Sequence, residues 1–179
     1  RGWTYSKEER QSLREQMRDR YHVGEEETIY LFAGRVSPEK GVLEMTRAFR
    51  AVLPRLRHKS RLFIVGSASS GSDKESYYYR AVKKEAAQSP ESIILTGYIN
   101  HEDVAKYHVM ADAQIVPSIM DDPAPLTVLE GMSMGNFLLL SKAGGIPEYS
   151  ANYSNKIFFE RGDSFEKNIR DAFLYYDQD

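Results

Sequence analysis

The chain has 179 residues and an apolar fraction of 41%, which is enough for one domain with a proper core. It contains no cysteine, so disulfide frameworks, thiolate chemistry and cysteine-ligated zinc are excluded. Its formal net charge of −2 argues against nucleic acid as a partner, and no apolar run approaches the ~20 residues of a membrane-spanning helix. Residues 1–25 are charged throughout, so we expect no signal peptide.

The helices and strands expected from the hydrophobic pattern alternate along the chain. In chain order we expect a helix at 7–22, a strand at 28–33, a helix from Gly41 to about residue 56, a strand at 61–66, a helix at 74–88, a strand at 92–96, a helix at 101–110, a strand at 113–117, a helix at 125–134, a strand at 137–141, a short helix near Pro147, a strand at 156–159 and a helix at 164–175. The three consecutive tyrosines at 77–79 fan out around their helix, so we expect at least one to be exposed and none to form a site.

Six short apolar strands that alternate with helices predict an α/β fold, a single Rossmann-like doubly wound parallel sheet spanning residues 1–179. In the commonest order of such sheets, 3-2-1-4-5-6, the first and fourth strands are neighbours, and ligands bind in the crevice between them. Here the first strand ends at Gly34 and the fourth at Pro117. The loops that follow these two strands are therefore expected to face each other across one cleft.

The residue types in these two loops suit a nucleoside diphosphate. Arg35 offers a planar fork of donors and Lys40 a point charge. Pro125 fits the first turn of the next helix, whose free amides at Leu126 and Thr127 form a positive end that binds phosphate. Further along, Glu130 can accept hydrogen bonds from ribose hydroxyls, and Asp122 lies nearer the far end of the ligand, where sugar hydroxyls would be.

Simpler interpretations stand beside these. Residues 35–61 carry eight Lys or Arg against two Glu, which indicates either a solvated helix face or a surface near an anionic lipid or ligand. Gly66 could be only a turn, and Ile99 only a core residue. His101 and His108 share one side of a short helix, but a metal would need another ligand, so we expect core or surface roles. No nucleotide-binding glycine motif follows the first strand, which counts against a dinucleotide cofactor.

Two segments of the chain resemble a known family. They are GRVSPEKG and, later in the sequence, DPAPLTVLEGMSMGNFLLLSKAGGIPE. They are similar to the C-terminal, donor-binding half of retaining GT-B glycosyltransferases of family four, which has G-R-x(4)-K-G after its first strand and E-x(7)-E around the donor helix. The resemblance extends from about Ile29 to Phe173. It is specific because both motifs occur in this order and at this separation.

The resemblance implies a role for each matching position. Arg35 and Lys40 would bind the diphosphate, Glu130 the ribose and Asp122 the donor sugar, and together they form the predicted catalytic set. The predicted nucleotide-binding positions are Gly34, Gly66, Ile99, Pro125, Leu126 and Thr127. Ile99 corresponds to a backbone position that contacts the base, and Gly66 to a glycine that permits close approach. No metal ligand is predicted, and no cofactor beyond a UDP- or GDP-linked sugar as substrate.

Three departures from the family pattern stand out. Asp122 is one methylene shorter than the usual glutamate, and Ala124-Pro125 replaces the common Phe-Gly. We expect this chain to lack the N-terminal acceptor domain of the family and to need that domain as a partner for transfer. We expect the donor-binding half of a hexosyltransferase of polysaccharide synthesis, cytoplasmic or peripheral at the inner membrane face, with a lipid-linked acceptor as one option. The alternatives are a nucleotide-binding scaffold module, and an epimerase or phosphorylase of the same architecture.

Overall fold

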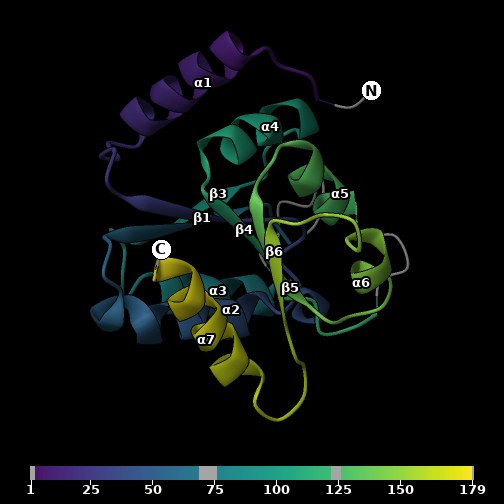
Figure 1. Ribbon diagram of the computed structural model, residues 1–179. Helices are drawn as coiled ribbons and strands as arrows, with labels where there is room; N and C mark the ends of the chain where they lie inside the picture. The colour runs from purple at the N-terminus through teal and green to yellow at the C-terminus, as the bar shows by residue number, and fades with distance from the viewer. Residues whose placement is uncertain (1–2, 69–75, 122–125, 179) are drawn as a thin grey trace.

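The computed structural model describes residues 3–68, 76–121 and 126–178, and Figure 1 shows their arrangement. The strands are β1 (Thr28–Ala33), β2 (Ser60–Val65), β3 (Ile93–Gly97), β4 (Ala113–Val116), β5 (Phe137–Ser141) and β6 (Lys156–Phe159). The α-helices are α1 (Lys7–Arg20), α2 (Val42–Val52), α3 (Tyr77–Ala86), α4 (His101–Met110), α5 (Leu126–Ser133), α6 (Ile146–Tyr149) and α7 (Phe165–Asp177).

The six strands form one parallel sheet in the order β3-β2-β1-β4-β5-β6, so the predicted fold class and strand order are both confirmed. β1 pairs with β4 through Tyr30 and Leu31, which face Ala113 and Gln114. The carboxyl ends of β1 and β4 therefore lie side by side, at the place where the direction of the winding reverses.

Helices cover both faces of the sheet, as Figure 1 shows. On one face, Tyr30 and Phe32 of β1 belong to a core cluster with α2, α3 and α7. Ile29 and Leu31, which alternate with them, point to the other face and pack with α1 and α4, while α5 and α6 continue that layer over β4 and β5. The apolar strands are buried on both sides, which explains their unbroken hydrophobic runs in the sequence.

Element ends differ from expectation by a few residues for identifiable reasons. α2 ends at Val52 and continues as a 3₁₀ turn over Leu53–Arg55, because Pro54 cannot donate its part of the helical ladder. α3 begins only at Tyr77, where the Ser76 hydroxyl accepts from the Tyr79 amide at 3.0 Å. The tyrosine run behaves as predicted. Tyr77 is 86% exposed, while Tyr78 packs inward.

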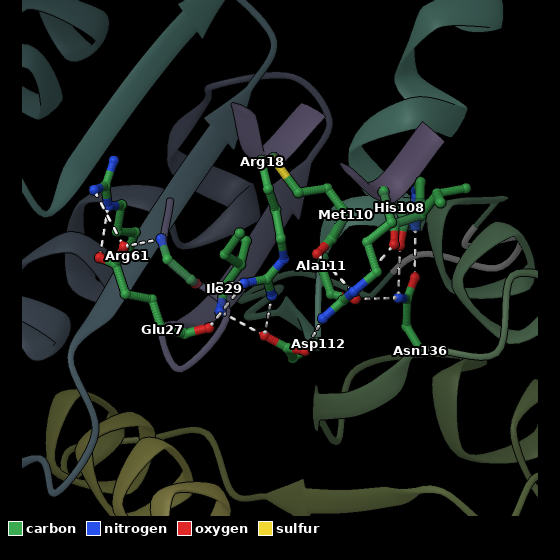
Figure 2. A network of polar contacts seen from close by, with 12 residues as sticks. Arg18, Glu27, Ile29, Arg61, His108, Met110, Ala111, Asp112 and Asn136 are labelled. Atoms are coloured by element: carbon green, nitrogen blue, oxygen red, sulfur yellow. Dashed lines mark hydrogen bonds and ion pairs between the residues drawn. The ribbon is translucent and has the colours of Figure 1, made fainter. Parts of the chain in front are cut away.

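A polar network fastens α1 to the sheet, and Figure 2 shows it. The Asp112 carboxylate, just before β4, accepts from Arg14 at 2.8 Å, from Arg18 at 3.2 Å and from the Ile29 amide at 2.8 Å. Arg18 is buried, and its Nη1 donates to the carbonyls of Gly24 at 2.8 Å and Glu27 at 3.3 Å. Both charges are therefore paired where they leave water, which fixes the charged helix that the sequence places ahead of β1.

Candidate functional site

The floor of the site is made by glycines at the ends of neighbouring strands. Gly34 follows β1 and donates to the Val65 carbonyl at 3.0 Å, and Gly66 follows β2 and donates to the Gly97 carbonyl at 3.1 Å. Gly66 has φ +143°, and a Cβ built on it would lie 1.9 Å from the Gly34 carbonyl oxygen. Only glycine allows the two backbones to come this close, and both glycines line the site.

Residues 34–41, which we call the cationic loop, are tied to the loop after β4. The Glu39 carbonyl accepts from the Ile119 amide at 2.9 Å. Gly41 has φ +69°, and a Cβ there would lie 2.0 Å from the Pro117 carbonyl oxygen. The pKa of the Glu39 carboxyl is lowered, mainly by a hydrogen bond from its own amide, with smaller contributions from Arg35 and Lys40. The cationic loop is thus held against β4 while Arg35 remains exposed.

The start of α5 is fixed to β1 and β4 through Thr127. Its hydroxyl donates to the Ala33 carbonyl at 3.0 Å, directly before the cationic loop. The fully buried Gln114 of β4 donates to the Thr127 carbonyl at 3.0 Å and to its hydroxyl at 2.8 Å. This anchoring places the start of α5, whose first amides have no partner inside the helix, beside the end of β1. Sequence patterns gave no indication of Gln114.

Two hollows meet at this point and together form what we call the cleft. One, of about 380 Å³, is lined by Gly66, Ile99 and Glu130 among others. The other, of about 460 Å³, contains Lys40 and Glu39. They share Ala33, Gly34, Arg35, Leu126 and Thr127. The cationic loop and the start of α5 therefore lie across one cleft, as the strand order predicted.

Eight predicted site residues are described, and all of them line the cleft: Gly34, Arg35, Lys40, Gly66, Ile99, Leu126, Thr127 and Glu130. Asp122 and Pro125 lie outside the described residues. The roles assigned to these ten residues stay predictions, since geometry shows where a side chain lies and not what it binds.

The sequence analysis missed one polar neighbour of Glu130. His101, the first residue of α4, lines the cleft, and its Nε2 lies 2.8 Å from Glu130 Oε1. The two histidines of α4 share one side, as expected, but Trp3 packs against both rings, at centroid distances of 4.8 Å for His101 and 5.3 Å for His108. His108 is buried and bonds to Asn136, so the two do not converge on one point.

A further polar contact orders the outer wall. Asp121 Oδ1 accepts from the Gly144 amide and from Arg161, both at 2.9 Å. These contacts lower the pKa of the Asp121 carboxyl, the Gly144 hydrogen bond most and the Arg161 hydrogen bond next. Arg161 also donates to the Ile119 carbonyl at 2.7 Å. The loop after β4 is thereby joined to the loops after β5 and β6.

Neither a metal site nor a membrane-spanning helix is found among the described residues. No cluster of three or more His, Cys, Asp or Glu side chains could hold a metal ion there. Within the same ranges, no helix combines the length and the apolar character needed to cross a bilayer. That donor binding needs no metal or cofactor stays a prediction.

Comparison with known sequences identifies relatives. A family model described as glycosyl transferases group 1 matches residues 14–175. Lipopolysaccharide 1,2-N-acetylglucosaminetransferase of Salmonella typhimurium is 31% identical over 147 residues, which cover 82% of this chain and 37% of the relative. The chain thus spans well under half the length of that protein.

Solved structures share the fold. Sucrose-phosphate synthase from Thermosynechococcus elongatus matches with a TM-score of 0.75 and 21% identity, covering 92% of this chain and 40% of that one. Anabaena HepE, solved in complex with UDP and glucose, matches with a TM-score of 0.71 and 20% identity, covering 90% and 42%. At these identities the likeness concerns the fold alone.

Proposed function

Because the chain belongs to the glycosyl transferases group 1 family, we propose that it is the donor-binding half of a retaining glycosyltransferase that uses a nucleoside-diphosphate sugar. One observation carries the proposal: the cationic loop, the start of α5 and Glu130 line a single cleft at the end of β1. The UDP in the related HepE structure supports a uridine donor, and GDP remains the other candidate.

Catalysis would consist mainly of stabilising the leaving group. The bond between the anomeric carbon and the β-phosphate oxygen breaks, and the diphosphate departs with the electron pair. Arg35, Lys40 and the α5 amides of Leu126 and Thr127 line the cleft, where they would donate to the diphosphate as its charge grows and so lower the barrier. The acceptor hydroxyl oxygen bonds to the same face of the sugar carbon and passes its proton to the departing diphosphate oxygen, so the carbon retains its configuration. No metal is required when these groups supply the positive charge.

The remaining predicted residues would hold the rest of the donor. Glu130 would accept from the ribose hydroxyls, and the backbone at Ile99 would contact the base. Gly34 and Gly66 carry no side chain, so the nucleotide can approach the strand ends closely. Asp122 would contact the donor sugar, and Pro125 would open the helix.

The acceptor would be bound elsewhere in the whole protein. This chain corresponds to 37% of the length of its Salmonella relative, and we propose that an N-terminal domain supplies the acceptor site. The name of that relative favours an acceptor in polysaccharide synthesis, lipid-linked or at a membrane surface. We place the reaction in the cytoplasm, with peripheral contact at the inner membrane face.

Isothermal calorimetry with UDP and GDP tests the proposal. Removing a cation that bonds a phosphate oxygen costs about 1.5–3 kcal/mol, so Arg35→Ala and Lys40→Ala are each expected to weaken binding roughly tenfold or more. The matched control is Arg47→Ala, which removes an arginine of α2 that pairs with Glu166 at 3.6 Å on the outer surface. A folded sample that binds neither nucleotide, or that binds equally well without Arg35 and Lys40, would overturn the proposal.

A further inference from the structure

The contact between His101 and Glu130 joins two helices across the cleft. His101 begins α4 and Glu130 lies in the second turn of α5, yet Nε2 and Oε1 are 2.8 Å apart. An ionised carboxylate can only accept, so the proton must lie on Nε2, and the histidine donates. The His101 side chain is 62% exposed and that of Glu130 only 20%.

This contact occupies one carboxylate oxygen and leaves the other available. Glu130 Oε2 has no hydrogen-bond partner among residues 3–68, 76–121 and 126–178, and the carboxylate lines the hollow bounded by Ile99 and Gly66. With Oε1 held, the rotation of the carboxylate is restricted, and Oε2 can accept a hydroxyl from a ligand in that hollow.

We propose that His101 is a positioning residue for the nucleotide: it holds Glu130 in the rotamer that accepts the ribose hydroxyls. The inference rests on the proposed function, because it needs a ribose in the cleft. A free glutamate has three rotatable bonds, and ordering such a side chain on binding lowers affinity. Pre-ordering it through His101 improves affinity by roughly three- to tenfold.

His101 is itself held from behind. The Trp3 ring lies 4.8 Å from the His101 ring at an interplanar angle of 31°, so the indole covers one imidazole face. Trp3 also rests on His108, which Asn136 fixes through a 2.8 Å hydrogen bond. At the start of α4, the Asn100 side chain accepts from the Asp103 amide at 3.0 Å and caps the helix. The ring is therefore oriented by packing and not by Glu130 alone.

Two substitutions distinguish the effect of the His101 hydrogen-bond donor from the effect of its aromatic ring. His101→Phe keeps an aromatic ring against Trp3 but cannot donate to Glu130, so we expect UDP to bind roughly three- to tenfold more weakly. His101→Gln loses the ring but keeps an amide donor near the position of Nε2, so we expect an affinity within about twofold of wild type. Calorimetry with UDP on the folded variants gives both values.

A double-mutant cycle locates the effect. In a Glu130→Ala background the His101→Phe substitution is expected to cause no further loss, because the carboxylate that His101 positions is gone. The control is His58→Ala, since the His58 ring also pairs with a carboxylate, Asp177 at 3.2 Å, but lies before β2, at the other end of the sheet. This variant should bind UDP as wild type does.

The outcomes separate this inference from the proposed function. If the wild type does not bind UDP or GDP, the proposed function fails and this inference with it. If the wild type binds UDP and His101→Phe binds it equally well, the positioning role is overturned while the proposed function stands. An equal loss from His101→Phe with and without the Glu130 carboxylate would likewise overturn it, because the histidine would then act on something else.

Discussion

Gly66 has only a hydrogen atom where every other residue has a Cβ, and this allows the ends of β1 and β2 to lie as close together as they do. The Cβ of any other residue would lie 1.9 Å from the Gly34 carbonyl oxygen, and that oxygen belongs to backbone, which cannot move aside without disturbing β1. The position also has φ +143°. Steric collision and backbone strain therefore act together at the floor of the cleft.

Gly66→Ala is expected to lower the free energy of unfolding by roughly 3 kcal/mol in urea denaturation. Gly162→Ala is the matched control, because Gly162 has φ +104° but a Cβ there would meet no atom within 4 Å. The Gly162→Ala variant has the backbone strain without the steric collision, so its free energy of unfolding should fall by only about 1 kcal/mol. Equal losses in the two variants would show that the contact with Gly34 is unimportant.

His108 is a second residue whose surroundings have a measurable consequence. Asn136 donates through Nδ2 to the carbonyls of His108 and Ala111, so its Oδ1 is the acceptor and His108 Nδ1 carries the proton. Burial lowers the pKa of His108 from 6.5 to about 4. The ring is therefore neutral in the folded protein at pH values where it would be charged in the unfolded chain.

Stability should fall as the pH is lowered because of this residue. Between pH 6.5 and about 4 the unfolded state binds the proton and the folded state does not, so acidification favours unfolding. From pH 7 to pH 5 the loss is about 2 kcal/mol. Urea denaturation at both pH values should show a loss in wild type that exceeds the loss in His108→Gln by about this amount. Parallel losses in the two proteins would contradict the assignment.

At the scale of elements, the helix α5 lines the cleft, and polar contacts hold its first turn against the sheet. Gln114 enters from β4 and bonds to Thr127, and Thr127 bonds to the Ala33 carbonyl. Gly131 allows the close approach, since a Cβ there would lie 1.8 Å from Gln114 Oε1. The position of the helix start relative to the cationic loop therefore depends on a buried amide that does not itself line the cleft.

Gln114→Met removes this amide at nearly constant length. We expect a loss of about 1–2 kcal/mol in the free energy of unfolding, because two buried hydrogen bonds disappear, together with weaker UDP binding as the α5 amides lose their anchor. Gln16→Met on the exposed side of α1 is the control and should change neither quantity. Unchanged UDP affinity in a destabilised Gln114→Met would show that α5 keeps its position by apolar packing alone.

At the scale of the whole molecule, basic side chains of residues 35–61 form ion pairs with acidic residues from separate parts of the chain. Arg50 pairs with Glu85 at 2.5 Å, Arg61 with Glu27 at 3.0 Å, and Arg47 with Glu166. Each partner comes from a different part of the chain. These pairings support the simpler interpretation of that stretch as a helix face and its surroundings, and they leave Arg35 and Lys40 as the cations that line the cleft.

Periodicity and turn residues were sufficient to predict the six strands, and the commonest order of doubly wound sheets then predicted which two loops meet at the cleft. These features depend on local residue spacing and on the strong handedness of parallel crossover connections, so they can be predicted from sequence patterns. The ends of α2 and α3 were predicted less accurately, because the missing amide donor of Pro54 decides the first and the hydrogen bond to the Ser76 hydroxyl decides the second. That the described residues among the predicted site positions line one cleft was also predictable, wherever residue type and position after a strand agreed.

The sequence by itself determined an α/β chain with cations after the first strand and carboxylates after the fourth. Three contacts were decided only by the tertiary structure. Gln114 anchors α5, the backbone of Gly66 packs closely against that of Gly34, and the His101 ring bonds to the Glu130 carboxylate. The physical reason is that these are contacts between residues well separated along the chain, whose geometry depends on rotamers and on helix placement over the sheet. Such contacts leave no periodic pattern, and they exist only once the layers have packed.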